Sequence, residues 1–98
     1  MKIKVQSIHF DADKKLITYI EQKIQKVTGK FDNVISSDVI LKIEKSTRID
    51  NKIAEVKISV PGNDLFVKKQ SQSFEESIDL ATDALNKQLT KRKEKIRG

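Results

Sequence analysis

The apolar residues of this chain recur at two different spacings, and the succession of these spacings constrains the fold more than any other feature. Four segments alternate apolar and polar residues as half-buried β-strands do: residues 2–8, 34–45, 53–60 and 65–70. Two further segments have an apolar residue every three or four positions, as along one face of an α-helix: residues 14–28 and 74–96. The predicted order of elements is therefore β-α-β-β-β-α.

Each predicted strand and helix has one apolar face, which restricts how these elements can pack. The sequence Pro61-Gly62-Asn63-Asp64 predicts a tight turn, so we expect the last three strands to form an antiparallel meander. The simplest fold is an α+β two-layer sandwich, in which a four-stranded sheet carries both helices on one face. Double-stranded-RNA-binding domains place their two helices in the same way. With 98 residues, we expect a single domain over residues 1–98.

Several residues mark the ends of the helices and the core between them. Asp11 or Asp13 can cap the first helix, and Gly29 suits a left-handed position that ends it. Ser73 and Glu76 form a capping box before the last helix. From the strands, we expect the core to contain Val39, Leu41, Ile43, Val56, Ile58 and Val60. From the helices, we expect it to contain Leu16, Ile17, Ile20, Ile24, Val27, Phe74, Ile78, Ala81, Leu85 and Leu89.

The composition argues against most catalytic chemistry. The chain has no cysteine and one histidine, His9, so we expect neither a metal site nor a Ser-His-Asp or Cys-His arrangement. The carboxylates are scattered among lysines, so we expect no catalytic residue and no cofactor, with a carboxylate-only hydrolase as the enzymatic alternative. The sequence shows no signal-peptide apolar region and no apolar run near the roughly 20 residues of a membrane-spanning helix, so we expect a cytoplasmic protein.

Positive charge is concentrated at the end of the chain. The whole sequence has 20 basic and 14 acidic residues, a net charge of +6. Residues 87–98 contain six basic residues and one acidic residue, which leaves 14 and 13 for the remaining 86 residues. A concentrated basic segment of this kind is typical of a surface that binds a polyanion, such as nucleic acid or an anionic membrane.

The helical period arranges these basic residues in two stripes. In the last helix the basic residues are Lys87, Lys91, Arg92, Lys93, Lys95 and Arg97, and in the first helix they are Lys23, Lys26 and Lys30. The last helix spans about 34 Å and a seven-residue strand about 23 Å, so we expect its basic end to project beyond the sheet. Two simpler explanations stay open: basic residues late in a helix complement its dipole, and the lysines of the first helix are solvated.

Aromatic residues make up only 5% of the chain, which is few for a surface that stacks on bases. We therefore expect Lys and Arg to recognise the backbone and shape of structured RNA. A true double-stranded-RNA-binding domain is disfavoured, because Glu75 and Glu76 would repel phosphate at the start of the last helix. A membrane surface is disfavoured because residues 85–98 have no Trp or Phe. A basic module that binds an acidic protein remains an alternative.

Several short motifs are shared with a known family. Tyr19-Ile20-Glu21-Gln22-Lys23-Ile24 is similar to the family's first helix and Val60-Pro61-Gly62 to its hairpin. The most specific motifs lie in the last helix: Ile78-Asp79-Leu80-Ala81, Leu85-Asn86-Lys87-Gln88-Leu89 and Lys91-Arg92-Lys93-Glu94-Lys95. Through these motifs the chain resembles the ribosome hibernation-promoting factors, also called ribosome-associated inhibitors. It looks like a short form, without the acidic tail of one subgroup or the dimerising C-terminal domain of another.

The resemblance implies a specific function. Members of this family bind the small ribosomal subunit in the decoding channel, where they compete with messenger RNA, transfer RNA and initiation factors. They inhibit translation in stationary or stressed cells, and we expect this chain to be a monomer when it is off the ribosome. The resemblance places ribosomal RNA contacts at Lys23, Lys26, Lys87, Lys91, Lys93 and Lys95. Lys30 follows Gly29 in a less certain alignment, and charge alone adds Arg92 and Arg97.

Overall fold

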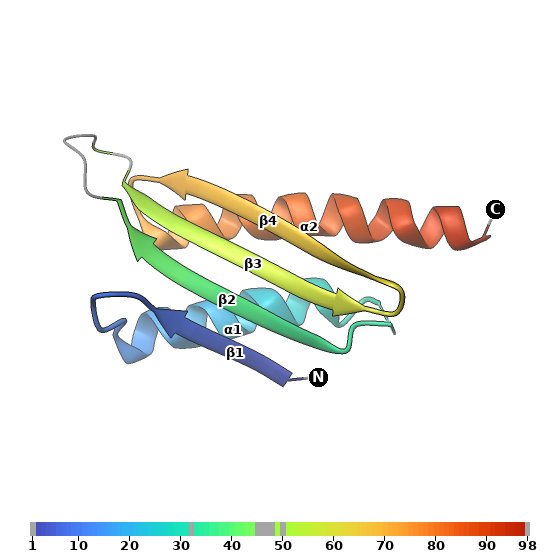
Figure 1. The fold of residues 1–98 in the computed structure, drawn as a ribbon, viewed down its shortest axis with the longest axis horizontal. Coiled ribbons are helices and arrows are strands. Elements are labelled where there is room, and N and C mark those ends of the chain that lie inside the picture. Colours follow the sequence, from blue (N-terminus) through green and yellow to red (C-terminus); the bar gives the residue numbers. More distant parts are fainter. Residues whose placement is uncertain (1, 32, 45–48, 50, 98) are drawn as a thin grey trace.

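The computed structural model of the chain contains six elements in the predicted order (Figure 1). They are β1 (Lys2–Ser7), α1 (Lys14–Thr28), β2 (Ser36–Ile43), β3 (Lys52–Val60), β4 (Asn63–Ser71) and α2 (Phe74–Arg97). The structure describes residues 2–31, 33–44, 49 and 51–97, and for residues 63 and 92–97 it describes the backbone alone.

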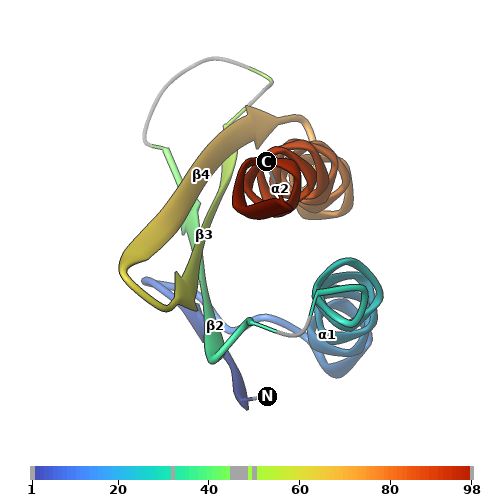
Figure 2. The same cartoon turned by 90° about the vertical axis from the view of Figure 1, so that its right-hand side faces the viewer.

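The four strands form one sheet in the order β1-β2-β3-β4. β1 pairs in parallel with β2, with Lys2 opposite Ser36, and α1 is the crossover between these two strands. β2, β3 and β4 pair antiparallel in succession, so the predicted meander is confirmed. Figure 2 shows both helices on the same face of this sheet, as the apolar faces of the elements predict. The fold is therefore the expected α+β two-layer sandwich.

The core lies between the sheet and the two helices. Its fully buried side chains include Ile20 and Ile24 of α1, Ile78 and Leu85 of α2, and Ile58 of β3. Leu16, Val27 and Phe31 pack against this core while remaining partly exposed. Ile43 has the inward parity of Val39 and Leu41, but the prediction that it belongs to the core is wrong. Ile43 ends β2 at the margin of the sheet, and 43% of it is exposed.

Local hydrogen bonds explain where the helices begin. Asp13 caps α1 by accepting from the amide of Leu16 at 2.7 Å, and Ser73 caps α2 by accepting from the amide of Glu76 at 3.1 Å. At the end of α1, the prediction of a left-handed Gly29 is wrong, because its φ is −63°. Glycine suits this position for another reason: a Cβ atom here would lie 2.8 Å from the carbonyl oxygen of Gln25.

The turn between β3 and β4 is shorter than the sequence suggests. Val60 pairs with Asn63, so only Pro61 and Gly62 lie between the strands, and β4 begins two residues before the predicted residue 65. Gly62 has a φ of +87°, a conformation that glycine adopts without steric cost. Proline before such a glycine is typical of a type II turn.

Candidate nucleic-acid interface

The two helices run in the same direction, so their C-terminal ends lie at the same end of the molecule. In Figure 1, α1 runs from blue to cyan and α2 from orange to red, both from left to right. This arrangement follows from the topology, because β1 and β4 each end at the left of that view and each is followed by a helix. Basic residues that lie late in both helices are thereby brought to one end.

The last turns of α2 project beyond the sheet, as the lengths of the elements predict. α2 has 24 residues and β4 has 9, and these correspond to about 36 Å and about 30 Å. The red end of α2 extends past the turn between β3 and β4 in Figure 1.

The start of α2 is fixed to the sheet, and this determines where its other end points. The hydroxyl of Ser77 donates to the carbonyl oxygen of Lys52 at 2.7 Å, which ties the first turn of α2 to β3. The ring of Phe74 stacks on that of Phe10 at a centroid distance of 5.1 Å, which ties the same turn to the segment before α1. α2 is therefore held firmly at its N-terminal end.

Four of the predicted RNA-binding residues have exposed, described side chains. These are Lys26 in the last turn of α1, Lys30 just after that helix, and Lys87 and Lys91 in the second half of α2. In the part of the chain that the structure describes, no carboxylate lies within ion-pair distance of any of them. The backbone of α2 continues through the other predicted residues, whose side chains lie outside the described part: Arg92, Lys93, Lys95 and Arg97.

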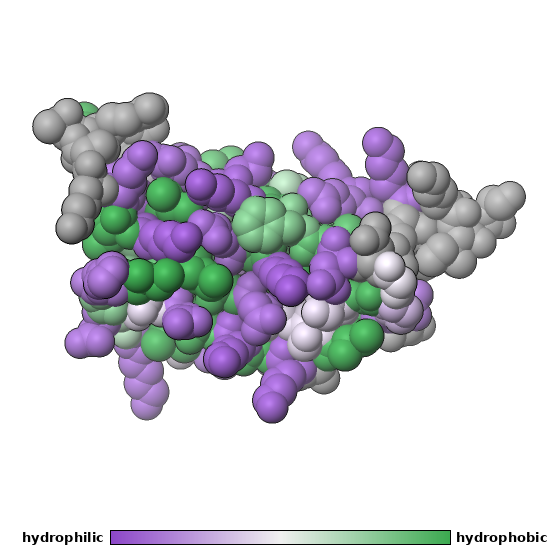
Figure 3. All heavy atoms as spheres, in the orientation of Figure 1, coloured by the Kyte–Doolittle hydropathy of each residue, from purple (hydrophilic) through white to green (hydrophobic). Residues whose placement is uncertain are grey.

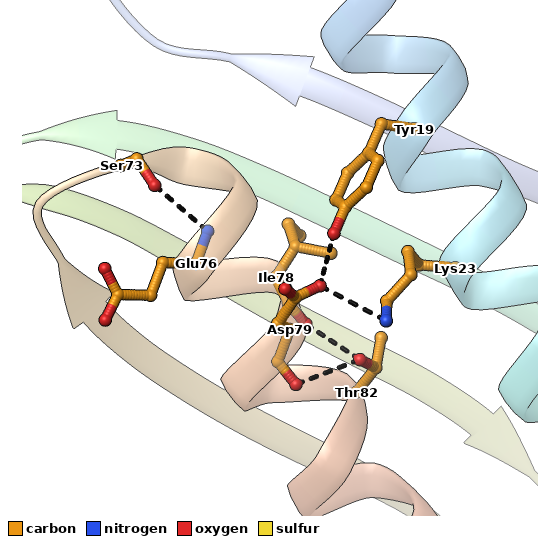
Figure 4. A network of polar contacts seen from close by, with 7 residues as sticks. All are labelled: Tyr19, Lys23, Ser73, Glu76, Ile78, Asp79 and Thr82. Atoms are coloured by element: carbon orange, nitrogen blue, oxygen red, sulfur yellow. Dashed lines mark hydrogen bonds and ion pairs between the residues drawn. The ribbon is translucent and has the colours of Figure 1, made fainter.

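Lys23 differs from the other predicted residues because it is paired within the protein. Its ammonium nitrogen lies 3.2 Å from a carboxylate oxygen of Asp79 in α2, and 34% of its side chain is exposed. The hydroxyl of Tyr19 donates to the same oxygen at 2.5 Å (Figure 4). This role of Asp79 could not be predicted from the sequence, because acidic residues early in a helix are already explained by the helix dipole.

The contact between the helices shifts the pKa values of Asp79 and Tyr19. The hydrogen bond from Tyr19 lowers the pKa of Asp79; desolvation acts in the opposite direction, and Lys23 adds to the lowering. The same hydrogen bond, together with desolvation and the negative charge of Asp79, raises the pKa of Tyr19 to about 12. Both shifts favour a carboxylate at Asp79 and a phenol at Tyr19, which is the arrangement in which the hydroxyl donates to the carboxylate.

The opposite face of the sheet has a mixed charge pattern. Figure 3 shows this face, where hydrophilic and hydrophobic residues are interspersed. Lys42 pairs with Glu55 at 3.0 Å and Lys57 pairs with Asp64 at 3.4 Å, so these lysines are partly neutralised. Phe66 is 57% exposed on the same face. The four strands together nevertheless contain seven lysines and three carboxylates, so positive charge is present on the sheet as well as at the helix ends.

Two other features are absent from the part of the chain that the structure describes. In residues 2–31, 33–44, 49 and 51–97, no group of three or more His, Asp or Glu side chains is placed to hold a metal ion. Over the same ranges, no helix combines the length and the apolar character needed to cross a membrane.

Comparison with known proteins identifies one family over nearly the whole chain. The family model for sigma 54 modulation protein / S30EA ribosomal protein matches residues 3–97. A ribosome hibernation promoting factor from Azotobacter vinelandii is 32% identical, over 97% of this chain and 85% of its own length. Another from Pseudomonas putida is 28% identical, over 97% and 89% respectively. The solved structure of a ribosomal subunit interface protein from Coxiella burnetii has the same fold, with a TM-score of 0.84 and 24% identity over 95% of this chain and 98% of that one.

Proposed function

Since the chain belongs to the sigma 54 modulation protein / S30EA ribosomal protein family, we propose that it is a ribosome hibernation factor. In this proposal it binds the small ribosomal subunit in the decoding channel and prevents messenger RNA and transfer RNA from binding there. Translation is thereby inhibited in stationary or stressed cells. The names of the relatives from Azotobacter vinelandii and Pseudomonas putida support ribosome hibernation as the process.

The observation that carries this proposal is that both helices run in the same direction and carry exposed lysines toward their C-terminal ends. Lys26 and Lys30 belong to one helix end, Lys87 and Lys91 to the other, and all four are exposed. Lysines without carboxylate partners can neutralise phosphates of folded RNA without reading its sequence. In our proposal, the remaining contacts come from the segment that contains Arg92, Lys93, Lys95 and Arg97.

The proposal also covers the domain organisation, cellular location and oligomeric state of the protein. Residues 1–98 act as one ribosome-binding domain, in the cytoplasm, as a monomer before binding and without a cofactor. Initiation factors compete for the same place on the small subunit, because they too need the decoding region to be open.

Co-sedimentation with purified small ribosomal subunits tests the proposal directly. We expect the protein to pellet with the subunits at low salt. The amount of protein in the pellet should be lower when messenger RNA and initiator transfer RNA are bound first. Binding that is unaffected by these ligands would contradict the decoding-channel site. Equal binding to an unrelated structured RNA would favour a general RNA-binding domain instead, and binding that survives RNase treatment of a lysate would favour an acidic protein partner.

The proposed mechanism is occupancy and not catalysis, so inhibition should be stoichiometric. In cell-free translation, we expect inhibition to saturate at equimolar protein and to reverse after a high-salt wash. The test is to incubate ribosomes for hours with far less protein than ribosomes and then to remove it. Loss of activity in more ribosomes than there were protein molecules would show that the effect is catalytic.

A further inference from the structure

One carboxylate joins the two helices that carry the basic residues. Asp79 of α2 accepts the hydroxyl of Tyr19 and lies within ion-pair distance of Lys23, both through the same oxygen (Figure 4). Tyr19 and Lys23 are one helical turn apart on α1, so they lie on the same side of that helix. The three residues therefore connect two successive turns of α1 to a single point on α2.

The backbone that carries Asp79 is itself fixed. Thr82 is buried, and its hydroxyl lies 2.9 Å from the carbonyl oxygen of Ile78 and 3.1 Å from that of Asp79. Ile78, next to Asp79, is fully buried in the core. Asp79 thus projects from a rigid part of α2, whereas 48% of its side chain is exposed to solvent. A carboxylate held in this way can define the position of a neighbouring helix.

An exposed lysine lies on the same side of α1, and another follows the helix directly. Lys26 comes three residues after Lys23, so it continues the side on which Tyr19 and Lys23 contact α2, and Lys30 lies two residues beyond Thr28, where α1 ends. A rotation of α1 about its own axis would move both lysines relative to α2. The contact at Asp79 opposes this rotation and so determines how the basic end of α1 lies relative to Lys87 and Lys91.

The contact also changes what Lys23 can do. A phosphate that approached its ammonium group would have to come close to the Asp79 carboxylate, which has the same sign of charge. Lys26 and Lys30 have no such neighbour in the described part of the chain. The three lysines of this stripe are therefore not equivalent.

We propose that Asp79 is a positioning residue for RNA binding: it holds Tyr19 and Lys23, fixes α1 against α2, and withdraws Lys23 from the surface that meets phosphate. This inference rests on the proposed function, because it concerns the same basic surface. It assigns Lys23, which the sequence places among the RNA contacts, to the contact between the helices.

The first test compares Asp79→Asn with Asp83→Asn, which removes the same charge from an exposed position one turn further along α2. Both changes make the protein more basic, so electrostatics alone predicts equal or tighter binding to small subunits. We expect Asp83→Asn to bind as the unmodified protein does, and Asp79→Asn to bind roughly three- to tenfold more weakly, as the loss of a partly exposed polar contact implies. Tyr19→Phe should weaken binding similarly without any change of charge.

The second test separates positioning from phosphate contact by the salt dependence of binding. Lys26→Met should reduce the slope of log affinity against log salt by about 0.7 to 0.9, as expected for one lost phosphate contact. Lys23→Met should weaken binding and leave this slope unchanged. Melting curves of all variants confirm that each is folded at the temperature of the binding assay.

The outcomes distinguish this inference from the function on which it rests. If the unmodified protein does not bind small subunits, both the proposed function and the inference are overturned. If it binds, and Asp79→Asn binds as tightly as Asp83→Asn, the positioning role alone is overturned. If Lys23→Met lowers the slope of log affinity against log salt as much as Lys26→Met does, Lys23 contacts phosphate. That result would also overturn the inference.

Discussion

Removing two lysines from the second half of α2 should weaken RNA binding by an amount that follows from their number. Lys87 and Lys91 are exposed and one turn apart, so a phosphate-bearing surface can meet both. The double variant Lys87→Met, Lys91→Met keeps most of the aliphatic length of each side chain and removes both charges. Exposed substitutions of this kind change the free energy of unfolding by less than about 0.5 kcal/mol, so folding should be unaffected.

The magnitude is set by counterion release. Each phosphate contact contributes about 0.7 to 0.9 to the slope of log affinity against log salt, so the loss of two lowers the slope by about 1.4 to 1.8. If the non-electrostatic part of binding is unchanged, affinity at 0.1 M salt falls by about 25- to 60-fold, and the difference vanishes as the salt approaches 1 M.

The assay is a titration of small ribosomal subunits at several salt concentrations, with Lys68→Met, Lys69→Met as the matched control. Both control lysines are exposed on β4, outside the basic helix ends, and the control removes the same net charge. We expect the control to leave the slope nearly unchanged. An equal loss of slope in both double variants would refute our reasoning, because it would mean that net charge and not its position determines binding.

Three further predictions concern stability and pH. Leu85 is fully buried, so Leu85→Ala should lower the free energy of unfolding by about 2 to 5 kcal/mol in urea titrations, and a smaller loss than this would place Leu85 outside the core. His9 has a φ of 65°, so His9→Gly should be more stable than His9→Val by about 1 to 2 kcal/mol, and equal melting temperatures would contradict that backbone conformation. The lowered pKa of Asp79 means that its contribution is present above pH of about 4 and is lost as the pH falls. The raised pKa of Tyr19, about 12, means that its contribution is present below pH of about 10 and is lost as the pH rises towards 12. The stability difference between the unmodified protein and Asp79→Asn should therefore be largest between these limits, and a pH-independent difference would speak against the contact.

The elements and their inward faces could be predicted because they depend on local periodicity. Ile20, Ile24, Ile78 and Leu85 repeat at the helical spacing, and all four are buried as that spacing requires. The caps could be predicted for a similar reason, since a capping side chain bonds to an amide only a few residues away. The error at Ile43 shows the limit of such patterns, because periodicity does not tell where a strand leaves the core.

The candidate site could be predicted only in part. The exposure of Lys26, Lys30, Lys87 and Lys91 follows from their distance from the apolar stripe of each helix. The partner of Lys23 could not be found in this way, because it is 56 residues away along the chain and its contact depends on how the two helices are rotated. A pattern within one helix contains no information on the rotation of another.

The charge distribution along α2 also gives the molecule an electrical polarity. Its first turn carries Glu75 and Glu76, whereas its second half carries the exposed Lys87 and Lys91. Such a separation of charge along the long dimension of the molecule, which measures 46 Å, creates a dipole. The electric field of a polyanion orients this dipole before the two molecules make contact. The protein then approaches RNA with its basic end first, so a larger fraction of encounters has the orientation that leads to binding. Salt should accordingly slow association by shortening the distance over which this alignment acts.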